Sequence, residues 1–270
     1  MIKRAGFYAL LAVVMLYCAG PLAWQLITSI KPSGEIAVLP PLVSTNPTAA
    51  HYLSVFHDYS FARYILNSLI VAGSTTILSL LVGSICSFGL AKLRVPFASL
   101  VLAFILSVSM FPPIATVSPL YIIIRTLGLR DTLAALVMTH TVFSLPLTVW
   151  VLTNFFRTVP DDIYHAARID GCRPFQVYWK IMLPLSLPAV YTTAILVFIF
   201  SWNEFLFALT FTSSSARTVP VAIALFPGIH EMPWGEIAAA SVIVTLPIIL
   251  LVLFFQRKIV EGLTSGAVKG

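Results

Sequence analysis

Long apolar runs without any charged residue alternate with short polar segments along the chain. Six runs contain no Asp, Glu, Lys or Arg: Ala5–Ile30, Tyr64–Ala91, Val95–Ile124, Thr132–Phe156, Ile181–Asn203 and Ile237–Gln256. The shortest has 20 residues, and a helix of that length rises about 30 Å, the thickness of a bilayer's hydrocarbon core. The runs lack the period of two that a membrane β-barrel requires. The pattern therefore predicts an all-α, polytopic membrane protein with six transmembrane helices.

Composition agrees with a membrane protein. Of 270 residues, 59% are hydrophobic and only 10% are charged, whereas soluble domains carry roughly 25% charged residues. The first run follows Lys3 and Arg4 but is too long for the apolar region of a signal peptide, so we expect a retained helix. We expect a single transmembrane domain over residues 1–270, since no internal repeat is visible.

Basic residues are distributed unequally between the two sides of the predicted membrane. The side that carries the N-terminus has eleven Lys and Arg residues and the other side has five. The positive-inside rule then places both termini in the cytoplasm. This topology explains the net charge of +6 without a nucleic-acid partner. The cysteines Cys18, Cys86 and Cys172 lack metal-ligand spacing, so we expect no metal site.

Proline and glycine mark the irregular parts of the chain. Phe111-Pro112-Pro113 removes two backbone donors from the third run and predicts a kink or break. The outer segment Lys31–Arg63 contains a short amphipathic pattern around Tyr52–Phe56. A second outer segment, Phe205–Glu236, is too broken by Pro and Gly for another full span.

The polar loop of residues 158–182, between the fourth and fifth runs, carries signals for two short helices. Pro160 suits a first helical turn, and Asp161 and Asp162 complement the positive end of the helix dipole. The helix should run to about Asp170, with Gly171 in the left-handed conformation that ends it.

One face of this helix should let another surface approach closely, because it holds Ile163, Ala166, Ala167 and Asp170 at helical spacing. A second helix should start at Pro174. The dipeptides Leu183-Pro184 and Leu187-Pro188 should break it at the membrane boundary.

These residues carry a resemblance. Ala166-Ala167-x-x-Asp170-Gly171, followed by Phe175 and Leu183-Pro184, resembles the EAA loop of ATP-binding-cassette (ABC) importer permeases. Asn67-Ser68, Trp202-Asn203-Glu204 and the ending Gly262–Gly270 are similar to the MalG-type permeases of carbohydrate importers, the trehalose/maltose type. The resemblance covers about Tyr52 to Gly270 and implies the type I ABC importer permease fold.

The resemblance also implies partners and site residues. It implies a second homologous permease, two ATPase subunits that bind ATP and Mg²⁺, an extracytoplasmic solute-binding protein, a sugar substrate, and a bacterial cytoplasmic (inner) membrane location. The implied ATPase-coupling residues are Asp162, His165, Ala166, Ala167, Asp170, Gly171, Phe175, Leu183 and Pro184. The tail of residues 257–270 would reach the ATPases with Thr264, Ser265, Gly266 and Lys269.

One position departs from the family. The glutamate that usually precedes the two alanines is His165 here. A charge-assisted bond from that carboxylate to the ATPase would be lost or made pH-dependent. Asp161, Asp162 or Asp170 could take its place.

The chain has no nucleotide-binding motif of the form G-x-x-x-x-G-K-[ST]. We therefore expect no catalytic residue and no cofactor in this chain. ATP hydrolysis would belong to a separate subunit.

Polar side chains within the runs are the candidates for a translocation path, because burying them in lipid is unfavourable. The candidates are Asn67, His140, Trp202, Asn203 and Glu204. His140 is the only ionisable residue deep in a run, and it can also be read as a neutral histidine bonded between helices. The absence of a mid-run Lys or Arg favours a neutral sugar. The resemblance implies one of disaccharide or oligosaccharide size.

Other functions remain open at this point. A permease of the same class could carry glycerol phosphate or another small polar solute. An ion-coupled secondary transporter would need paired ionisable residues at mid-membrane or inverted repeats, and neither is visible. An intramembrane hydrolase would rest on Ser144 and His140 alone, four residues apart.

Overall fold

The computed structural model describes the backbone of residues 2–36, 42–44, 46–226 and 232–264, and side chains from residue 6 to residue 256 within these ranges. Every regular element in this part of the chain is a helix. The all-α prediction is therefore confirmed.

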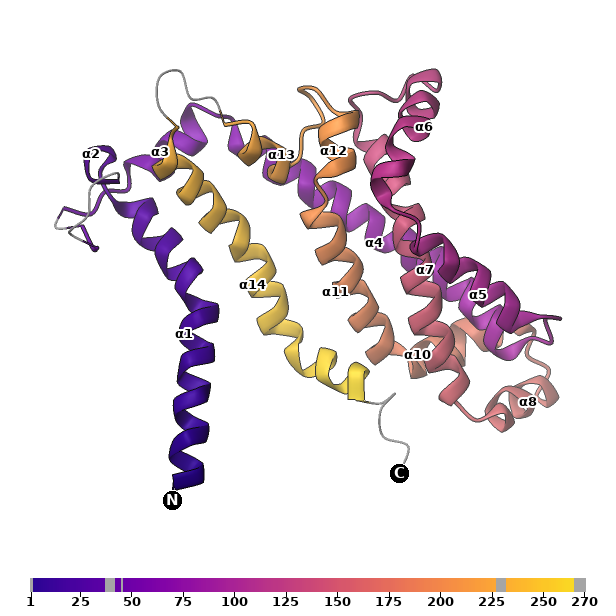
Figure 1. Ribbon diagram of the computed structural model, residues 1–270. Helices are drawn as coiled ribbons and strands as arrows, with labels where there is room; N and C mark the ends of the chain where they lie inside the picture. The colour runs from indigo at the N-terminus through magenta and orange to yellow at the C-terminus, as the bar shows by residue number, and fades with distance from the viewer. Residues whose placement is uncertain (1, 37–41, 45, 227–231, 265–270) are drawn as a thin grey trace. The chain divides into compact units, whose positions relative to one another are not determined.

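Four helices are each long and apolar enough to cross a membrane (Figure 1). They are α1 (Ile2–Ile30), α4 (Phe61–Lys92), α7 (Leu133–Thr158) and α14 (Trp234–Thr264). Two further candidate spans are bent pairs of helices. With each pair counted as one span, the described residues contain the six predicted transmembrane segments.

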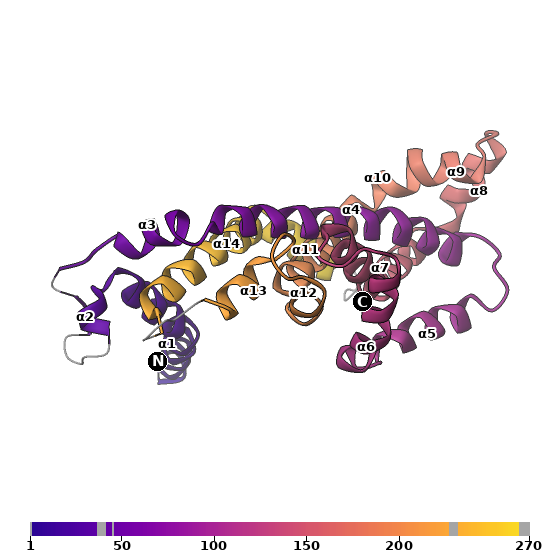
Figure 2. The same cartoon turned by 90° about the horizontal axis from the view of Figure 1, so that it is seen from above.

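The first bent pair consists of α5 (Ala98–Ser109) and α6 (Pro113–Thr126), which meet at 89° (Figure 2). Pro112 has φ −61° and ψ 124°, an extended conformation that ends the helical path. The break predicted from Phe111-Pro112-Pro113 is confirmed, because a proline donates no backbone hydrogen bond and restricts the residue before it.

The second bent pair turns by 80° between Pro174–Leu185 and α11 (Leu187–Asn203). Its first part contains α9 (Pro174–Val177), a π-helix at Tyr178–Met182 and α10 (Leu183–Leu185). The change of direction lies at Ser186, between the two predicted Leu-Pro breaks.

Short helices occupy the polar segments. They are α2 (Ser33–Ile36), α3 (Ala50–His57), α8 (Asp161–Ile169), α12 (Leu206–Phe211) and α13 (Val219–Ala224). The short helix expected around Tyr52–Phe56 is α3. The segment Phe205–Glu236 contains α12 and α13 and then the first residues of α14, so it holds no further full span within its described residues.

The chain divides into two compact units, Met1–Ile65 with Val219–Ile249, and Leu66–Thr218 with Leu250–Gly270. The first unit has a core of Val55, Phe61, Val219, Ala222, Phe226, Ala239 and Ala240. His51 lies beside this core, buried, with Nδ1 3.1 Å from Glu236 Oε1 and Nε2 donating to the Lys31 carbonyl at 2.8 Å.

In the second unit, α4 and α7 approach closely at Gly83. A Cβ added at Gly83 would lie 2.5 Å from Thr148 Cγ2. Four residues further along α4, the Ser87 hydroxyl donates to the Val149 carbonyl at 3.0 Å. Glycine is therefore favoured here because the Thr148 side chain of α7 occupies the space that a Cβ would need.

Candidate functional site

Helix α8 has the boundaries that its sequence signals predict. Pro160 precedes it directly, and Asp161 and Asp162 lie in its first turn. Gly171 follows the helix with φ +85°, and a Cβ there would have no neighbour within 4 Å. The left-handed backbone, not a close contact, favours glycine at this position.

Lys92, the last residue of α4, holds the start of α8. Its Nζ donates to Asp161 Oδ1 and to the Val159 carbonyl oxygen, both at 2.5 Å. The hydrogen bond and charge of Lys92 lower the pKa of the Asp161 carboxyl. Asp161 is thus bound within the chain, which leaves Asp162 and Asp170, both exposed, as carboxylates that could replace the absent glutamate.

The two alanines of α8 face in different directions. Ala167 is buried in a cluster with Phe88 of α4 and Phe156 of α7, whereas Ala166 is exposed. The expectation that both alanines share an open face is wrong for Ala167. Consecutive helical residues are about 100° apart, so when one faces the core its neighbour turns outward.

Exposed residues lie on α8, on α9, which packs beside α8 (Figure 2), and on the π-helix that follows α9. We call this set the α8–α9 surface; its residues are Asp162, Ile163, His165, Ala166, Ile169, Asp170, Phe175 and Trp179. Ile169 and Phe175 are 86% and 64% exposed. Large apolar side chains exposed together are typical of a protein interface.

Tyr178 supports this surface from beneath. It is buried, and its hydroxyl lies 2.7 Å from the Ser84 hydroxyl of α4. Its ring lies 5.8 Å from that of Phe175. Leu183 is half-buried and Pro184 is exposed in α10, so of these two predicted coupling residues only Pro184 lies at the surface.

His140 bonds two helices of the second unit together. Its ring is fully buried, with Nδ1 2.8 Å from the Ser201 hydroxyl of α11 and Nε2 3.1 Å from Glu204 Oε2. The Glu204 carboxylate also accepts backbone N–H groups from Phe207 at 2.8 Å and Ala208 at 3.1 Å. The interhelical reading of His140 fits these contacts, since both ring nitrogens already have partners.

The other path candidates do not converge on one point. Trp202 is buried and stacks on Phe198 with ring centroids 5.6 Å apart. Asn203 is exposed and donates to the Ile199 carbonyl of its own helix. Asn67 is buried and donates to backbone carbonyls of the loop after α12.

Asp131 is a residue that the sequence did not point out. It lies between α6 and α7, and its carboxylate accepts hydrogen bonds from the backbone of Ser213, Ser215 and Ala216. The partners are more than 80 positions away in sequence, and no local pattern indicates such a pairing.

Two predicted features lie at the edge of the described residues or beyond. Thr264 is the last residue of α14, and the positions Ser265, Gly266 and Lys269 of the predicted ATPase-contacting tail lie outside the described residues. Among the described residues, no group of three His, Cys, Asp or Glu side chains could hold a metal ion.

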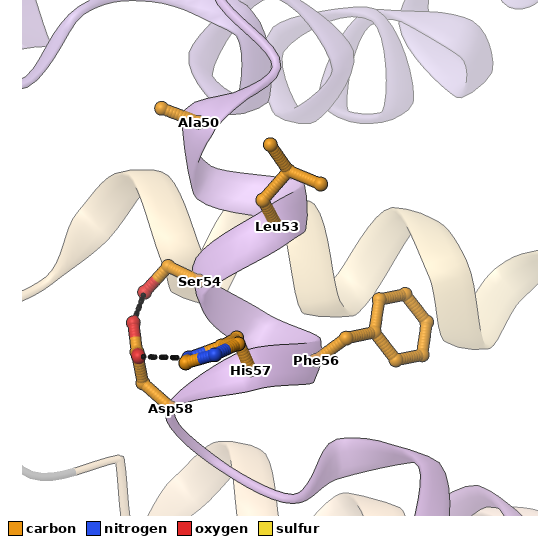
Figure 3. A pocket seen from close by; sticks show the side chains of 6 residues that line it. All are labelled: Ala50, Leu53, Ser54, Phe56, His57 and Asp58. Carbon is orange, nitrogen blue, oxygen red and sulfur yellow. Dashed lines mark hydrogen bonds and ion pairs between the residues drawn. The ribbon is translucent and has the colours of Figure 1, made fainter.

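A shallow, open pocket lies over α3, lined by Ala50, Leu53, Ser54, Phe56, His57 and Asp58 (Figure 3). Asp58 accepts hydrogen bonds from the Ser54 hydroxyl and the His57 ring, and both lower the pKa of its carboxyl. His57 and Asp58 are 91% and 57% exposed, and exposed pairs of this kind contribute little energy. The pocket contains none of the predicted path residues.

Comparison with known proteins identifies the family of this chain. Residues 79–265 match the family described as "Binding-protein-dependent transport system inner membrane component". The chain is 40% identical to the trehalose transport system permease protein of Mycobacterium tuberculosis, over 99% of each chain. It is also 40% identical to the trehalose/maltose transport system permease protein of Thermococcus litoralis, over 96% of this chain and 95% of that one. Identity to the sulfoquinovosyl glycerol permease of Agrobacterium fabrum is 39%, over 93% and 88%.

Solved structures share the fold. A chain of a bacterial ABC transporter involved in import of the acidic polysaccharide alginate has a TM-score of 0.81, at 21% identity over 95% of this chain and 96% of that one. A second, from an alginate transporter in complex with an alginate pentasaccharide-bound periplasmic protein, has a TM-score of 0.59 at 15% identity, over 96% of each chain. The chain therefore belongs to the binding-protein-dependent transport system inner membrane component family, and it is a multi-pass membrane protein with the type I ABC importer permease fold.

Proposed function

We propose that this chain is a permease subunit of an ATP-driven, binding-protein-dependent importer that carries a disaccharide or oligosaccharide across a bacterial cytoplasmic membrane. The observation that carries the proposal is the identity of 39–40%, along nearly the whole chain, to permeases named for trehalose, trehalose/maltose and sulfoquinovosyl glycerol. All three names refer to sugars or sugar conjugates.

The proposed complex contains a second permease, two ATPase subunits and an extracytoplasmic solute-binding protein. The absence of a nucleotide-binding motif from the sequence supports a separate ATPase. The exposed apolar residues of the α8–α9 surface support a docked subunit on that face. The alginate transporter solved with its periplasmic protein supports a solute-binding partner.

In the proposed mechanism, closure of the ATPases displaces α8 and alternates access to the path. The contacts of α8 support this coupling. Asp161 binds Lys92 at the end of α4, and Ala167 packs with Phe88 of α4 and Phe156 of α7. A displacement of α8 would therefore act directly on two spanning helices.

Uptake by the reconstituted transporter tests the proposal. Proteoliposomes that contain both permeases and the ATPases, with ATP inside and the binding protein outside, should accumulate labelled trehalose or maltose. Liposomes without the ATPase subunits are the control and should not. Uptake that persists in the control, or that occurs for glycerol phosphate but for no sugar, would overturn the proposal.

A further inference from the structure

The loop between α12 and α13 is held from two sides by side chains that lie far away in sequence. We call residues Ser213–Arg217 the serine loop; Ser213, Ser214 and Ser215 are exposed. Asp131 binds its N–H groups, and Asn67 of α4 binds its carbonyl groups. A loop with exposed hydroxyls and no helical hydrogen bonds would otherwise have many accessible conformations.

The Asp131 carboxylate uses both oxygens. Oδ1 accepts the N–H groups of Ser213 at 2.9 Å and Ala216 at 3.1 Å. Oδ2 accepts from Ser215 twice, from its N–H at 3.0 Å and from its hydroxyl at 2.8 Å. Although partial burial raises the pKa of this carboxyl, the hydrogen bonds of the serine loop outweigh that effect and hold the pKa far below its usual range.

Asp131 also binds the end of α12, shortly before the serine loop, through its own backbone. Its N–H donates to the Phe211 carbonyl at 2.9 Å, and its φ is +57°. Non-glycine residues adopt this left-handed conformation infrequently, although Asp and Asn tolerate it better than most. Surrounding contacts must maintain such a conformation, and here they are the contacts with the serine loop.

Asn67 supplies the opposite polarity. Its side-chain Nδ2 donates to the Ser215 carbonyl at 3.0 Å and the Arg217 carbonyl at 2.9 Å, and the residue is only 7% exposed. The Asp131 carboxylate thus accepts hydrogen bonds from N–H groups of the serine loop, and the Asn67 amide donates hydrogen bonds to carbonyl groups of the same loop. Neither side chain can be replaced by one of the other polarity without unpaired groups.

We propose that Asp131 and Asn67 are positioning residues, which hold the serine loop in one conformation so that this loop, on the side of the membrane that the distribution of basic residues places outside, is presented preformed to the extracytoplasmic solute-binding protein. This inference rests on the proposed function. A preformed segment loses less conformational entropy on docking than a mobile one. The two residues therefore act on the affinity for the binding protein and leave the ATPase step itself unchanged.

Hydrogen exchange in the complete purified transporter tests the conformational part. Asp131→Asn keeps the shape and the backbone tolerance but turns an amide NH2 group toward backbone donors. We expect amide exchange at residues 213–216 to accelerate at least about tenfold, because each such hydrogen bond otherwise protects its amide. Asp58→Asn is the matched control, since Asp58 binds Ser54 and His57 and should leave these amides unchanged. Equal exchange in Asp131→Asn and wild type would overturn the proposal.

ATPase activity titrated with sugar-loaded binding protein tests the functional part. Asp131→Asn and Asn67→Asp should each raise the KM for the binding protein about tenfold, the effect of losing one or two net hydrogen bonds, with kcat unchanged. A lower kcat at unchanged KM, or no change in either, would overturn the positioning role. If the wild type itself shows no dependence on a binding protein, the proposed function fails, and the exchange experiment still decides whether the two residues hold the loop.

A milder variant covers the case in which Asp131→Asn does not assemble. Ser215→Ala removes only the hydroxyl, whose single proton lies within hydrogen-bond distance of two acceptors, Asp131 Oδ2 and the Asp131 carbonyl. Amide exchange at residues 213–216 should then accelerate, and the KM for the binding protein should rise, each by a smaller factor than in Asp131→Asn. An unchanged loop in an assembled Ser215→Ala transporter, together with unchanged KM, would contradict the proposal.

Discussion

Buried polar side chains in this permease bind mainly to other parts of the same chain. The Ser144 and Thr148 hydroxyls donate to carbonyls one turn back in α7, which is a common arrangement for Ser and Thr in helices. His140 and Asn67 have specific partners in other segments. The residue types therefore indicated that polar side chains lie within the predicted spans. They did not indicate whether these side chains bind a substrate or form hydrogen bonds to other residues of the chain.

Because of the Asp131 carboxylate, the stability of the folded protein should depend on pH only at acidic pH, below about 4. Its pKa is lowered in the folded protein, so its stabilising effect is complete above the unfolded pKa of about 4 and is lost as pH falls toward the lower folded pKa. The Tm difference between wild type and Asp131→Asn should be constant from pH 5 to 8 and shrink below pH 4. Thermal unfolding of the purified protein in detergent measures it. A Tm difference that varies between pH 5 and 8 would show that another group dominates.

Local signals predicted the elements well because their causes lie within a few residues. Pro112 broke the third run and Gly171 ended α8, each through its own backbone restrictions. The burial of Ala167 and the pairing of Asp131 with the serine loop were not predicted. Both depend on tertiary neighbours, and a single sequence contains no signal for which distant segments meet.

The approach of α4 to α7 depends on the absence of a side chain at Gly83. Gly83→Ala should lower the stability of the fold by about 1–3 kcal/mol, the usual cost of overpacking, because the added Cβ meets Thr148 Cγ2 at 2.5 Å. Gly89→Ala in the same helix is the control, since its Cβ would have no neighbour within 4 Å. Thermal unfolding of the variants measures the effect. Thr148→Ser should restore part of the loss, and equal melting of both glycine variants would refute the argument.

The end of α8 depends on a backbone conformation. Gly171→Val should impair ATP-driven uptake while the protein still inserts, because a β-branched residue is strained at φ +85°. Gly171→Asn, which tolerates left-handed φ better, should retain more activity. Uptake is compared at equal membrane abundance. Normal transport-coupled ATPase activity in Gly171→Val would speak against α8 as the coupling element.

At the scale of the whole molecule, the number of spans decides which side of the membrane each loop lies on. If each bent pair crosses the membrane, Arg94 and Leu127 lie on opposite sides, at the two ends of the α5–α6 pair. If that pair is a re-entrant loop, they lie on the same side. The positive-inside rule places Arg94 in the cytoplasm.

Impermeant thiol reagents can decide between these topologies. In a background with Cys18, Cys86 and Cys172 replaced by Ser, Leu127→Cys should be labelled from outside intact cells and Arg94→Cys only after permeabilisation. For the second bent pair, which ends with α11, Ser213→Cys should be labelled from outside intact cells and Phe175→Cys only after permeabilisation. Labelling of Arg94→Cys and Leu127→Cys from one side would reduce the number of spans.

Helix length also bears on the bilayer that suits this protein. The apolar part of α4, Tyr64–Ala91, has 28 residues and rises about 42 Å. The 17 residues of α11, the part of the second bent pair after its 80° turn, rise about 26 Å, against a hydrocarbon thickness near 30 Å. Longer acyl chains reduce the hydrophobic mismatch of α4 and increase that of α11, and shorter chains do the reverse. Transport in vesicles of defined lipids should therefore be fastest at an intermediate acyl-chain length, because the two helices respond to membrane thickness in opposite directions.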